Sequence, residues 1–232
     1  MFRSTLLSVF VLALTFSLLV AQDEAKLKSG PKVGAMMPKP FECLNINGPN
    51  KAIFVEPKNK DEPGFHVARP HCLVCKFALS PAMVIFAKEP AEGKDAAFTQ
   101  LLAKLDEVAA EFEDRSFAVG VVILSPDARD STNTSNGLKA EEIIKETVDR
   151  EKLIVRLKKV AEKLKHVIVA CHPVDGPKGY DLNPKADLTA IYYERMKVSN
   201  TWAFGPEALD AKDVDSIEKL VRGALKKKTA GK

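Results

Sequence analysis

The feature that most limits the fold of this chain is a regular alternation of two hydrophobic patterns that begins at residue 81. Residues 81–87, 117–124 and 166–171 are continuous apolar runs of strand length. Between them, residues 98–112 and 141–165 carry apolar side chains at spacings of three and four, which is typical of a helix with one buried stripe. Continuous apolar runs suit strands that are covered on both faces, as in a parallel sheet.

The remainder of the chain predicts a hairpin and a last helix. Residues 188–193 and 197–204 have the pattern of two antiparallel strands joined at residues 194–196. The last helix is expected to begin near Asp213 and to bury Val214, Ile217, Leu220, Val221 and Leu225. The element order β-α-β-α-β-β-α predicts an α/β fold, with a mixed sheet and helices on both of its faces.

The helix predicted over residues 141–165 is the longest, and a break is expected near Asp149. Its inward-facing set is predicted to be Ile143, Ile144, Val148, Leu153, Leu157, Val160 and Leu164.

The amino-terminal end has the pattern of an export signal. Arg3 precedes an apolar run from Leu6 to Val20, which is shorter than the roughly 20 residues that a membrane-spanning helix needs. Residues 1–21 are therefore expected to be a cleaved signal peptide, with an uncleaved anchor as the alternative. We expect a periplasmic or extracellular protein with no stable membrane span after cleavage.

Composition then predicts how the exported part is divided. Residues 22–32 are expected to form a flexible leader, residues 33–80 an irregular N-terminal arm, and residues 81–228 one folded domain. About 210 residues can bury one sizeable core. The net charge of +4 is well mixed, and the dense basic run at residues 226–228 is expected to be a solvated tail. No nucleic-acid partner and no cofactor are expected.

Four cysteines lie beyond the predicted signal: Cys43, Cys72, Cys75 and Cys171. An exported protein meets an oxidising compartment, so disulfides can form, and four cysteines allow three pairings. The pair Cys72–Cys75 is the most local one. It would leave Cys43 and Cys171 to pair with each other or to stay free.

The Cys72-x-x-Cys75 segment is the main candidate for chemistry, and three interpretations remain open. A two-residue spacing can close a small, reducible disulfide, and the neighbouring His71 and Lys76 would favour a thiolate. The pair can equally be a structural bridge. A zinc site would need a fourth ligand beside His71, Cys72 and Cys75, from Cys43, His66 or Cys171, and no second Cys-x-x-Cys exists. No metal site is therefore expected.

Three segments resemble the thioredoxin-like superfamily. Val33-Gly-x3-Pro-x-Pro-Phe is similar to the opening of peroxiredoxin-type and exported thioredoxin-like proteins. Cys72-Leu-Val-Cys75 followed by the apolar run at residue 81 resembles a group of exported bacterial proteins of this superfamily, and the final hairpin and helix resemble the end of a thioredoxin domain. The resemblance covers Val33 to Leu225 and implies a thiol or disulfide substrate, or a protein partner.

The same comparison exposes a departure from that family. Its cysteines follow the first central strand, where residues 88–94 of this chain hold none. Its cis-proline is also missing near Asp187-Leu188-Thr189, because Pro184 comes too early. Cys72 and Cys75 precede the strand instead. A six-residue strand spans roughly 20 Å, so the pair should lie near the opposite end of the sheet unless the loop folds back.

These observations predict an exported thioredoxin-like protein that lacks the usual active-site cysteines and acts as a non-catalytic binding or scaffold domain. The alternative is a thiol–disulfide oxidoreductase that uses Cys72 and Cys75, with Cys72 as the attacking thiol because His71 adjoins it. Glu89 and Glu92 are expected to be charges at the start of a helix. Cys171, which follows a strand beside His172, is expected to be buried or disulfide-linked.

Overall fold

The computed structural model describes residues 27–48, 53–54, 65–66, 71–89, 96–129 and 139–227. The expected signal peptide lies outside them. A six-stranded sheet has the order β1-β6-β5-β4-β7-β8, and β2 and β3 form a separate pair. The strands are β1 (Leu44–Asn45), β2 (Ile53–Phe54), β3 (Phe65–His66), β4 (Ala82–Lys88), β5 (Ala118–Leu124), β6 (Val167–His172), β7 (Leu188–Glu194) and β8 (Lys197–Phe204). The helices are α1 (Leu73–Phe77), α2 (Ala96–Glu111), α3 (Ala140–Ala161) and α4 (Ala211–Lys227), with 3-10 turns at Glu113–Arg115 and Pro126–Ala128.

The mixed sheet expected from the sequence is confirmed. Strands β4, β5 and β6 are parallel, whereas β1, β7 and β8 run antiparallel to their neighbours. The parallel strands are joined by α2 and α3, because a parallel pair needs a long crossover connection. The predicted hairpin also forms, with its turn at residues 195–196 between β7 and β8.

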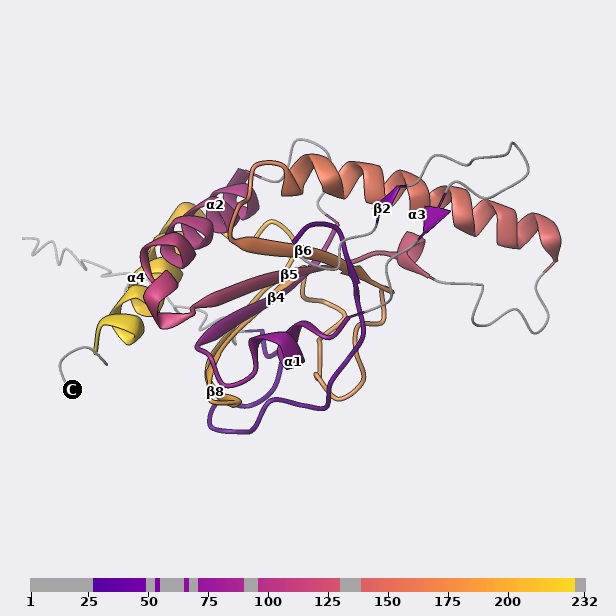
Figure 1. Ribbon diagram of the computed structural model, residues 1–232. Helices are drawn as coiled ribbons and strands as arrows, with labels where there is room; N and C mark the ends of the chain where they lie inside the picture. The colour runs from indigo at the N-terminus through magenta and orange to yellow at the C-terminus, as the bar shows by residue number, and fades with distance from the viewer. Residues whose placement is uncertain are drawn as a thin grey trace, which may run out of the picture.

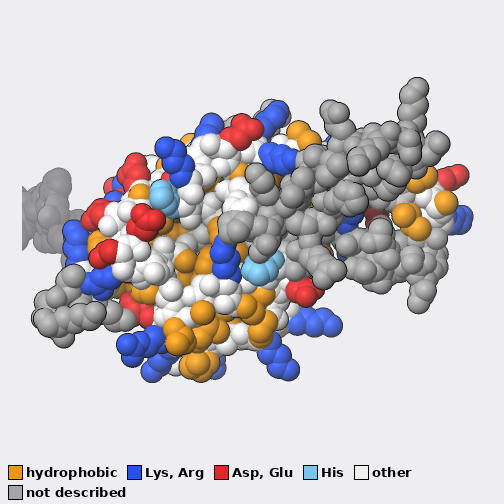
Figure 2. Space-filling view, in the orientation of Figure 1, with side chains coloured by type: hydrophobic (Ala, Val, Ile, Leu, Met, Phe, Trp, Pro, Cys, Tyr) orange, Lys and Arg blue, Asp and Glu red, His pale blue; other side chains and the backbone are white. Residues whose placement is uncertain are grey.

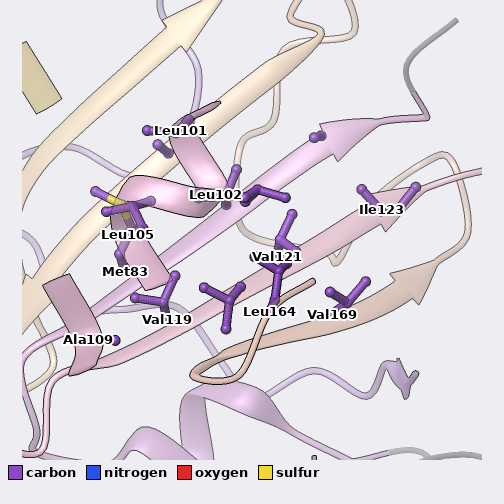
Figure 3. Packing of buried hydrophobic residues seen from close by; sticks show 14 of the residues in the cluster. Met83, Leu101, Leu102, Leu105, Ala109, Val119, Val121, Ile123, Leu164 and Val169 are labelled. Carbon is purple, nitrogen blue, oxygen red and sulfur yellow. The ribbon is translucent and has the colours of Figure 1, made fainter. Parts of the chain in front are cut away.

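One face of the sheet is covered by the three long helices (Figure 1). Side chains of α2 such as Leu101 and Leu105 point onto the strands, where Met83 and Val119 receive them (Figure 3). Leu153 and Leu157 of α3 and the buried residues of α4 complete this core. The spacing of three and four predicted from the sequence therefore faces the sheet, as expected for amphipathic helices.

The other face is covered by α1, the N-terminal segment and the loop after β6. The aromatic rings of Phe41, Phe86 and Tyr180 meet there, with centroids 5.1 to 5.6 Å apart. Helices thus lie on both faces, as predicted, but among the described helices only the five-residue α1 lies on this one. The short helix and the irregular segment leave the second face thinner than the first.

The long helix differs from its prediction in two ways. Helix α3 is continuous from Ala140 to Ala161, so the break expected near Asp149 is absent from this described helix. Ile144 and Val148, expected to point inward, are exposed. The first half of α3 extends past the end of the six-stranded sheet, so the strands of that sheet do not cover its apolar stripe (Figure 1). In α4, Leu220 is likewise partly exposed rather than buried.

The end of the predicted leader is attached to the sheet. The hydroxyls of Ser29 and Thr189 lie 2.6 Å apart, and Gly30 donates its N–H to the carbonyl of Asp181. Thr201 of β8 donates a hydrogen bond to the carbonyl of Pro31. The boundaries between leader, arm and domain stay predictions. Within the described residues, no helix has the length and apolar character needed to cross a membrane.

Candidate functional site: a displaced Cys-x-x-Cys

A disulfide joins Cys72 to Cys75 at the start of α1, with Cα atoms 5.3 Å apart. Cys72 is the N-cap residue of this helix and has an extended backbone. Its Sγ accepts a hydrogen bond from the backbone N–H of Cys75 at 3.1 Å. The sulfur therefore takes the place that a serine or aspartate oxygen usually fills at an N-cap.

Helix α1 is held in place by three apolar side chains rather than by the disulfide. Leu73, Val74 and Phe77 are buried against the sheet. A Cβ at Gly120 of β5 would lie 2.9 Å from Leu73 Cδ1 and 3.2 Å from the Phe77 ring. The absence of a side chain at Gly120 thus lets α1 pack closely on the strand.

The two sulfur-bearing residues differ in accessibility. Cys75 is exposed, whereas Cys72 is half-buried and packs against the core beneath α1. His71 is half-buried, and the exposed Lys76 follows Cys75. Desolvation lowers the pKa of Lys76. A partner in solution can therefore reach Cys75 more easily than Cys72.

The surface around α1 is apolar. Figure 2 shows hydrophobic side chains gathered on the lower part of this face, where α1 and the N-terminal segment lie. Three exposed large side chains belong to these two segments: Val33, Met36 and Leu79, each more than 60 % exposed. The disulfide thus lies near two segments that expose apolar side chains: the residues just after α1 and the N-terminal segment.

The other two cysteines are free thiols, and they lie on opposite faces of the sheet. Cys171 belongs to the core under the long helices and Cys43 to the core under α1. Burial raises the pKa of each thiol to about 12. Of the two outcomes left open for these residues, the described structure has them unpaired.

The usual cysteine position of the fold family, after β4, is occupied by ion pairs. Lys88 Nζ lies 2.8 Å from a carboxylate oxygen of Asp187 and also donates to the carbonyl of Pro184. Glu89 binds the guanidinium of Arg156, with Nε 2.6 Å away, and Arg156 also contacts Asp127. The hydrogen bond with Glu89 is the main cause of a raised pKa of Arg156, and the charge of Glu89 adds to it. Desolvation lowers this pKa but has a smaller effect than the hydrogen bond.

A cavity of about 330 Å³ opens beside the Lys88–Asp187 pair. Its apolar wall comes from α2, β7, the end of β8 and the segment after β8, and includes Phe98, Phe204 and Leu209. Such a cavity has the size of a small-molecule pocket. No cysteine lines it; its lining includes Lys88, Asp187 and Leu188, from the two segments where the sequence departs from the family, and also Glu89.

The structure places the predicted site residues as follows. Cys72 and Cys75 come together, and they lie on the α1 face rather than after β4. Glu89 is an ion-pair partner of α3, and Glu92 lies outside the described residues. The sequence did not predict the Lys88–Asp187 ion pair, because no local spacing links two residues that are 99 positions apart. In the part of the chain that the structure describes, no three potential ligands cluster around a metal position.

No protein-family model matches the sequence, and no curated protein matches it significantly. Solved structures do match. A proposed protein disulfide isomerase from Bacteroides thetaiotaomicron is 12% identical, has a TM-score of 0.50, and the match covers 86% of this chain and 95% of that one. A thiol peroxidase from Chromobacterium violaceum is 10% identical, with a TM-score of 0.49 and 87% and 92% covered. A proposed thiol:disulfide interchange protein DsbE from Chlorobium tepidum is 15% identical, with a TM-score of 0.44 and 86% and 99% covered.

Identities this low bear on the fold alone, not on activity. The strand order, the two helical crossovers and the final hairpin and helix agree with a thioredoxin-like fold. The chain therefore has a thioredoxin-like fold, and its Cys-x-x-Cys lies on a helix in front of the central strand.

Proposed function

We propose that this protein is a thiol–disulfide exchange protein that donates the Cys72–Cys75 disulfide to a partner. The observation that carries the proposal is the position of Cys72 at the N-cap of α1, where the N–H of Cys75 donates to its sulfur. A hydrogen bond to the charged form of a group favours that form. Cys72 is thereby suited to leave as a thiolate.

The exchange reaction follows from the different exposure of the two sulfurs. A partner thiolate attacks the accessible Sγ of Cys75, the Cys72–Cys75 bond breaks, and Cys72 departs as a thiolate. A second thiolate of the same partner then attacks the partner's own sulfur in the mixed disulfide, Cys75 leaves as a thiolate, and the oxidised partner is released. Two electrons pass from the partner dithiol to the protein, and Cys72 and Cys75 end as thiols. Exchange is faster when the leaving thiol is the better-stabilised one.

The alternative of a purely structural bridge is less well supported. Closing a loop of four residues removes little entropy from the unfolded chain, about 2 kcal/mol against about 3 kcal/mol for a fifteen-residue loop. Helix α1 is already fixed by the burial of Leu73, Val74 and Phe77. A local disulfide with one exposed sulfur-bearing residue, on a helix that buried side chains already anchor, suits exchange better than reinforcement.

The apolar surroundings favour a polypeptide partner. Leu79 and Met36 expose large side chains on α1's own segment and on the N-terminal segment. Contiguous exposed apolar surface on a soluble protein usually marks an interaction site. We therefore propose an unfolded or flexible polypeptide with reduced cysteines as the substrate class.

The test is a measurement of exchange with a reduced cysteine-containing polypeptide under anaerobic conditions, together with the reduction potential of the pair. We expect stoichiometric oxidation of the polypeptide by the oxidised protein and none by the Cys72→Ser/Cys75→Ser variant. Cys171→Ala, on the other face of the sheet, serves as the matched control and should retain the activity. A potential well below about −300 mV without exchange would assign the pair to structural bridges and refute the proposal.

A non-catalytic binding role is the second candidate, and one observation favours it. The vacated cysteine position adjoins the 330 Å³ cavity with its apolar wall and the Lys88–Asp187 pair at its edge. This candidate predicts that Phe204→Ala or Lys88→Met abolishes ligand binding without affecting thiol exchange. Loss of exchange in the double-serine variant with binding intact would separate the two functions.

A further inference from the structure

A third cysteine lies beneath the start of α1. Cys43 is paired with His71 as in an antiparallel sheet: the N–H of His71 donates to the Cys43 carbonyl at 2.9 Å, and that of Cys43 donates back at 3.2 Å. The Cα atoms of such a pair lie about 5.5 Å apart across the two strands. The next residue, Cys72, is displaced by about 3.4 Å along the strand, at right angles to that distance. These dimensions place the Cα atoms of Cys43 and Cys72 roughly 6.5 Å apart, near the upper end of the range of about 4.4–6.8 Å for disulfides.

The side chain of Cys43 also reaches toward Cys72. Its thiol donates to the carbonyl of His71, the residue before Cys72, with the sulfur and oxygen 3.2 Å apart. The backbone N–H of Leu73, the residue after Cys72, hydrogen-bonds to the same sulfur. The Cys43 sulfur is thus held against the peptide groups on both sides of Cys72. Cys72 itself packs against the core to which Cys43 belongs.

We propose that the Cys43 thiol exchanges with the Cys72–Cys75 disulfide, forming a Cys43–Cys72 disulfide and releasing Cys75 as a free, exposed thiol. The Cys43 sulfur attacks Cys72 Sγ, a new S–S bond forms there, and the Cys72–Cys75 bond breaks. The electron pair leaves with Cys75, which takes up the proton that Cys43 loses. No oxidant or reductant is consumed. The proposal rests on the same disulfide as the proposed function, but it needs no partner.

The consequence is a change in what the protein presents to solution without a change in its oxidation state. With Cys72–Cys75 closed, the surface offers a disulfide that a partner thiol can attack. With Cys43–Cys72 closed, the surface offers a nucleophile at Cys75 that can attack a partner disulfide. The same helix would then donate a disulfide to a partner in the first state and attack a partner's incorrect disulfide in the second.

Two buried groups bear on the reactivity of Cys43. Burial raises the pKa of its thiol to about 12, and the Leu73 N–H opposes that rise. The hydroxyl of Tyr180 is fully buried, has no hydrogen-bond partner among the described residues, and is close enough for a charge on Cys43 to act on it. The Tyr180 hydroxyl can rotate to donate a hydrogen bond to a thiolate that forms beside it. The exchange is therefore expected to be slow and confined to the interior.

The test labels the oxidised full chain with N-ethylmaleimide under non-reducing conditions and maps the products by peptide mass spectrometry. We expect a single adduct on Cys75 together with linked peptides of Cys43 and Cys72. An adduct on Cys43 with Cys72–Cys75 intact would mean that the core merely opens, and it would overturn the proposal. Absence of any Cys75 adduct would overturn it as well, while exchange with a partner could still be observed. Residual reduced molecules are recognised by a second adduct on Cys72.

Variants sharpen the result. Cys43→Ala should lower Cys75 labelling at least tenfold while disulfide donation to a reduced polypeptide persists, and Cys171→Ala should label like the unmodified protein. In Cys75→Ser, oxidised glutathione should produce the Cys43–Cys72 disulfide. In Cys72→Ser, whose hydroxyl oxygen replaces the sulfur as N-cap acceptor, oxidised glutathione should produce no link between Cys43 and Cys75. A Cys75→Ser protein that remains glutathionylated at Cys72, with Cys43 free, would refute the inference.

Discussion

Leu73 of α1 lies directly over Gly120 of β5, so closely that a Cβ on the glycine would come within 2.9 Å of the leucine Cδ1. This contact sets the height of α1 above the sheet and so the position of Cys72, which caps that helix. Gly120 has a backbone that any residue can adopt, because it lies in a regular strand. Glycine is needed at this position because α1 leaves no space for a side chain, not because of the backbone conformation.

Replacement of Gly120 by alanine is therefore expected to push α1 off the sheet. Overpacking of a filled core costs typically 1–3 kcal/mol, so we expect the free energy of unfolding to fall by about 2 kcal/mol. Denaturant unfolding followed by circular dichroism measures it. Gly223→Ala is the matched control, because nothing lies within 4 Å of its Cβ and alanine favours a helix. Equal stability of the two variants would contradict the close packing of α1.

The capping role of Cys72 can be separated from its redox role in the reduced protein. Serine can replace the sulfur as N-cap acceptor for the Cys75 N–H, whereas alanine cannot. In the presence of reductant we expect Cys72→Ala to be less stable than Cys72→Ser by about 1 kcal/mol. Thermal unfolding at equal protein concentration provides the measurement. If alanine and serine behave alike, the hydrogen bond to Cys72 contributes nothing to α1.

The ion pairs after β4 are expected to be unimportant for thiol exchange. The Lys88–Asp187 pair is about 40% exposed at both side chains, and pairs of this kind contribute about 0–1 kcal/mol. Lys88→Met should therefore leave both stability and the rate of disulfide donation within twofold of the unmodified protein. The assay is oxidation of a reduced polypeptide. A large loss of exchange activity would indicate that the reaction takes place at the end of β4, where the cysteines of related proteins are expected, and not at Cys72 and Cys75.

The buried thiols predict a loss of stability at alkaline pH. The pKa of Cys43 and Cys171 is about 12 in the folded protein, above its ordinary value near 9 in the unfolded chain. The folded state therefore holds these protons more tightly. The resulting stabilisation is complete below about pH 9 and is lost as the pH rises from 9 toward 12. Each thiol contributes a slope of roughly 1 kcal/mol per pH unit in this window.

Urea unfolding at a series of alkaline pH values checks this slope, with the Cys43→Ala/Cys171→Ala variant as the comparison. The variant should lose stability less steeply above pH 9, although buried tyrosines such as Tyr192 add a decline of their own at higher pH. Parallel curves for the two proteins would show that the thiols do not titrate during unfolding.

The attachment of residue 29 predicts that the domain needs its N-terminal segment. The Ser29 hydroxyl also accepts the N–H of Asn183, so Ser29→Ala leaves buried polar groups without a partner. We expect a destabilisation of about 1–3 kcal/mol. Lys32→Ala, on the exposed side of the same segment, should change stability by less than about 0.5 kcal/mol. Indistinguishable melting temperatures for the two variants would favour the flexible leader predicted from the sequence.

The sequence by itself determined the alternation of strands and helices, the hairpin and most of the core. These features depend on local periodicity, and Leu101, Leu105 and Val119 are buried as their spacing predicts. It did not determine that Ile144 and Val148 are exposed, because that depends on where the sheet ends beneath α3. A helical stripe indicates which side can be buried, and the neighbouring element decides whether it is.

The same distinction applies to the cysteines. Sequence spacing alone indicated that Cys72 and Cys75 can bond to each other, because three positions along a chain bring two residues close. Only the tertiary structure brought Cys43 against His71, 28 positions away and next to that disulfide, and placed Cys171 on the opposite face of the sheet. Contacts between distant segments depend on strand pairing and on which face a residue occupies, and neither leaves a local signal in the chain.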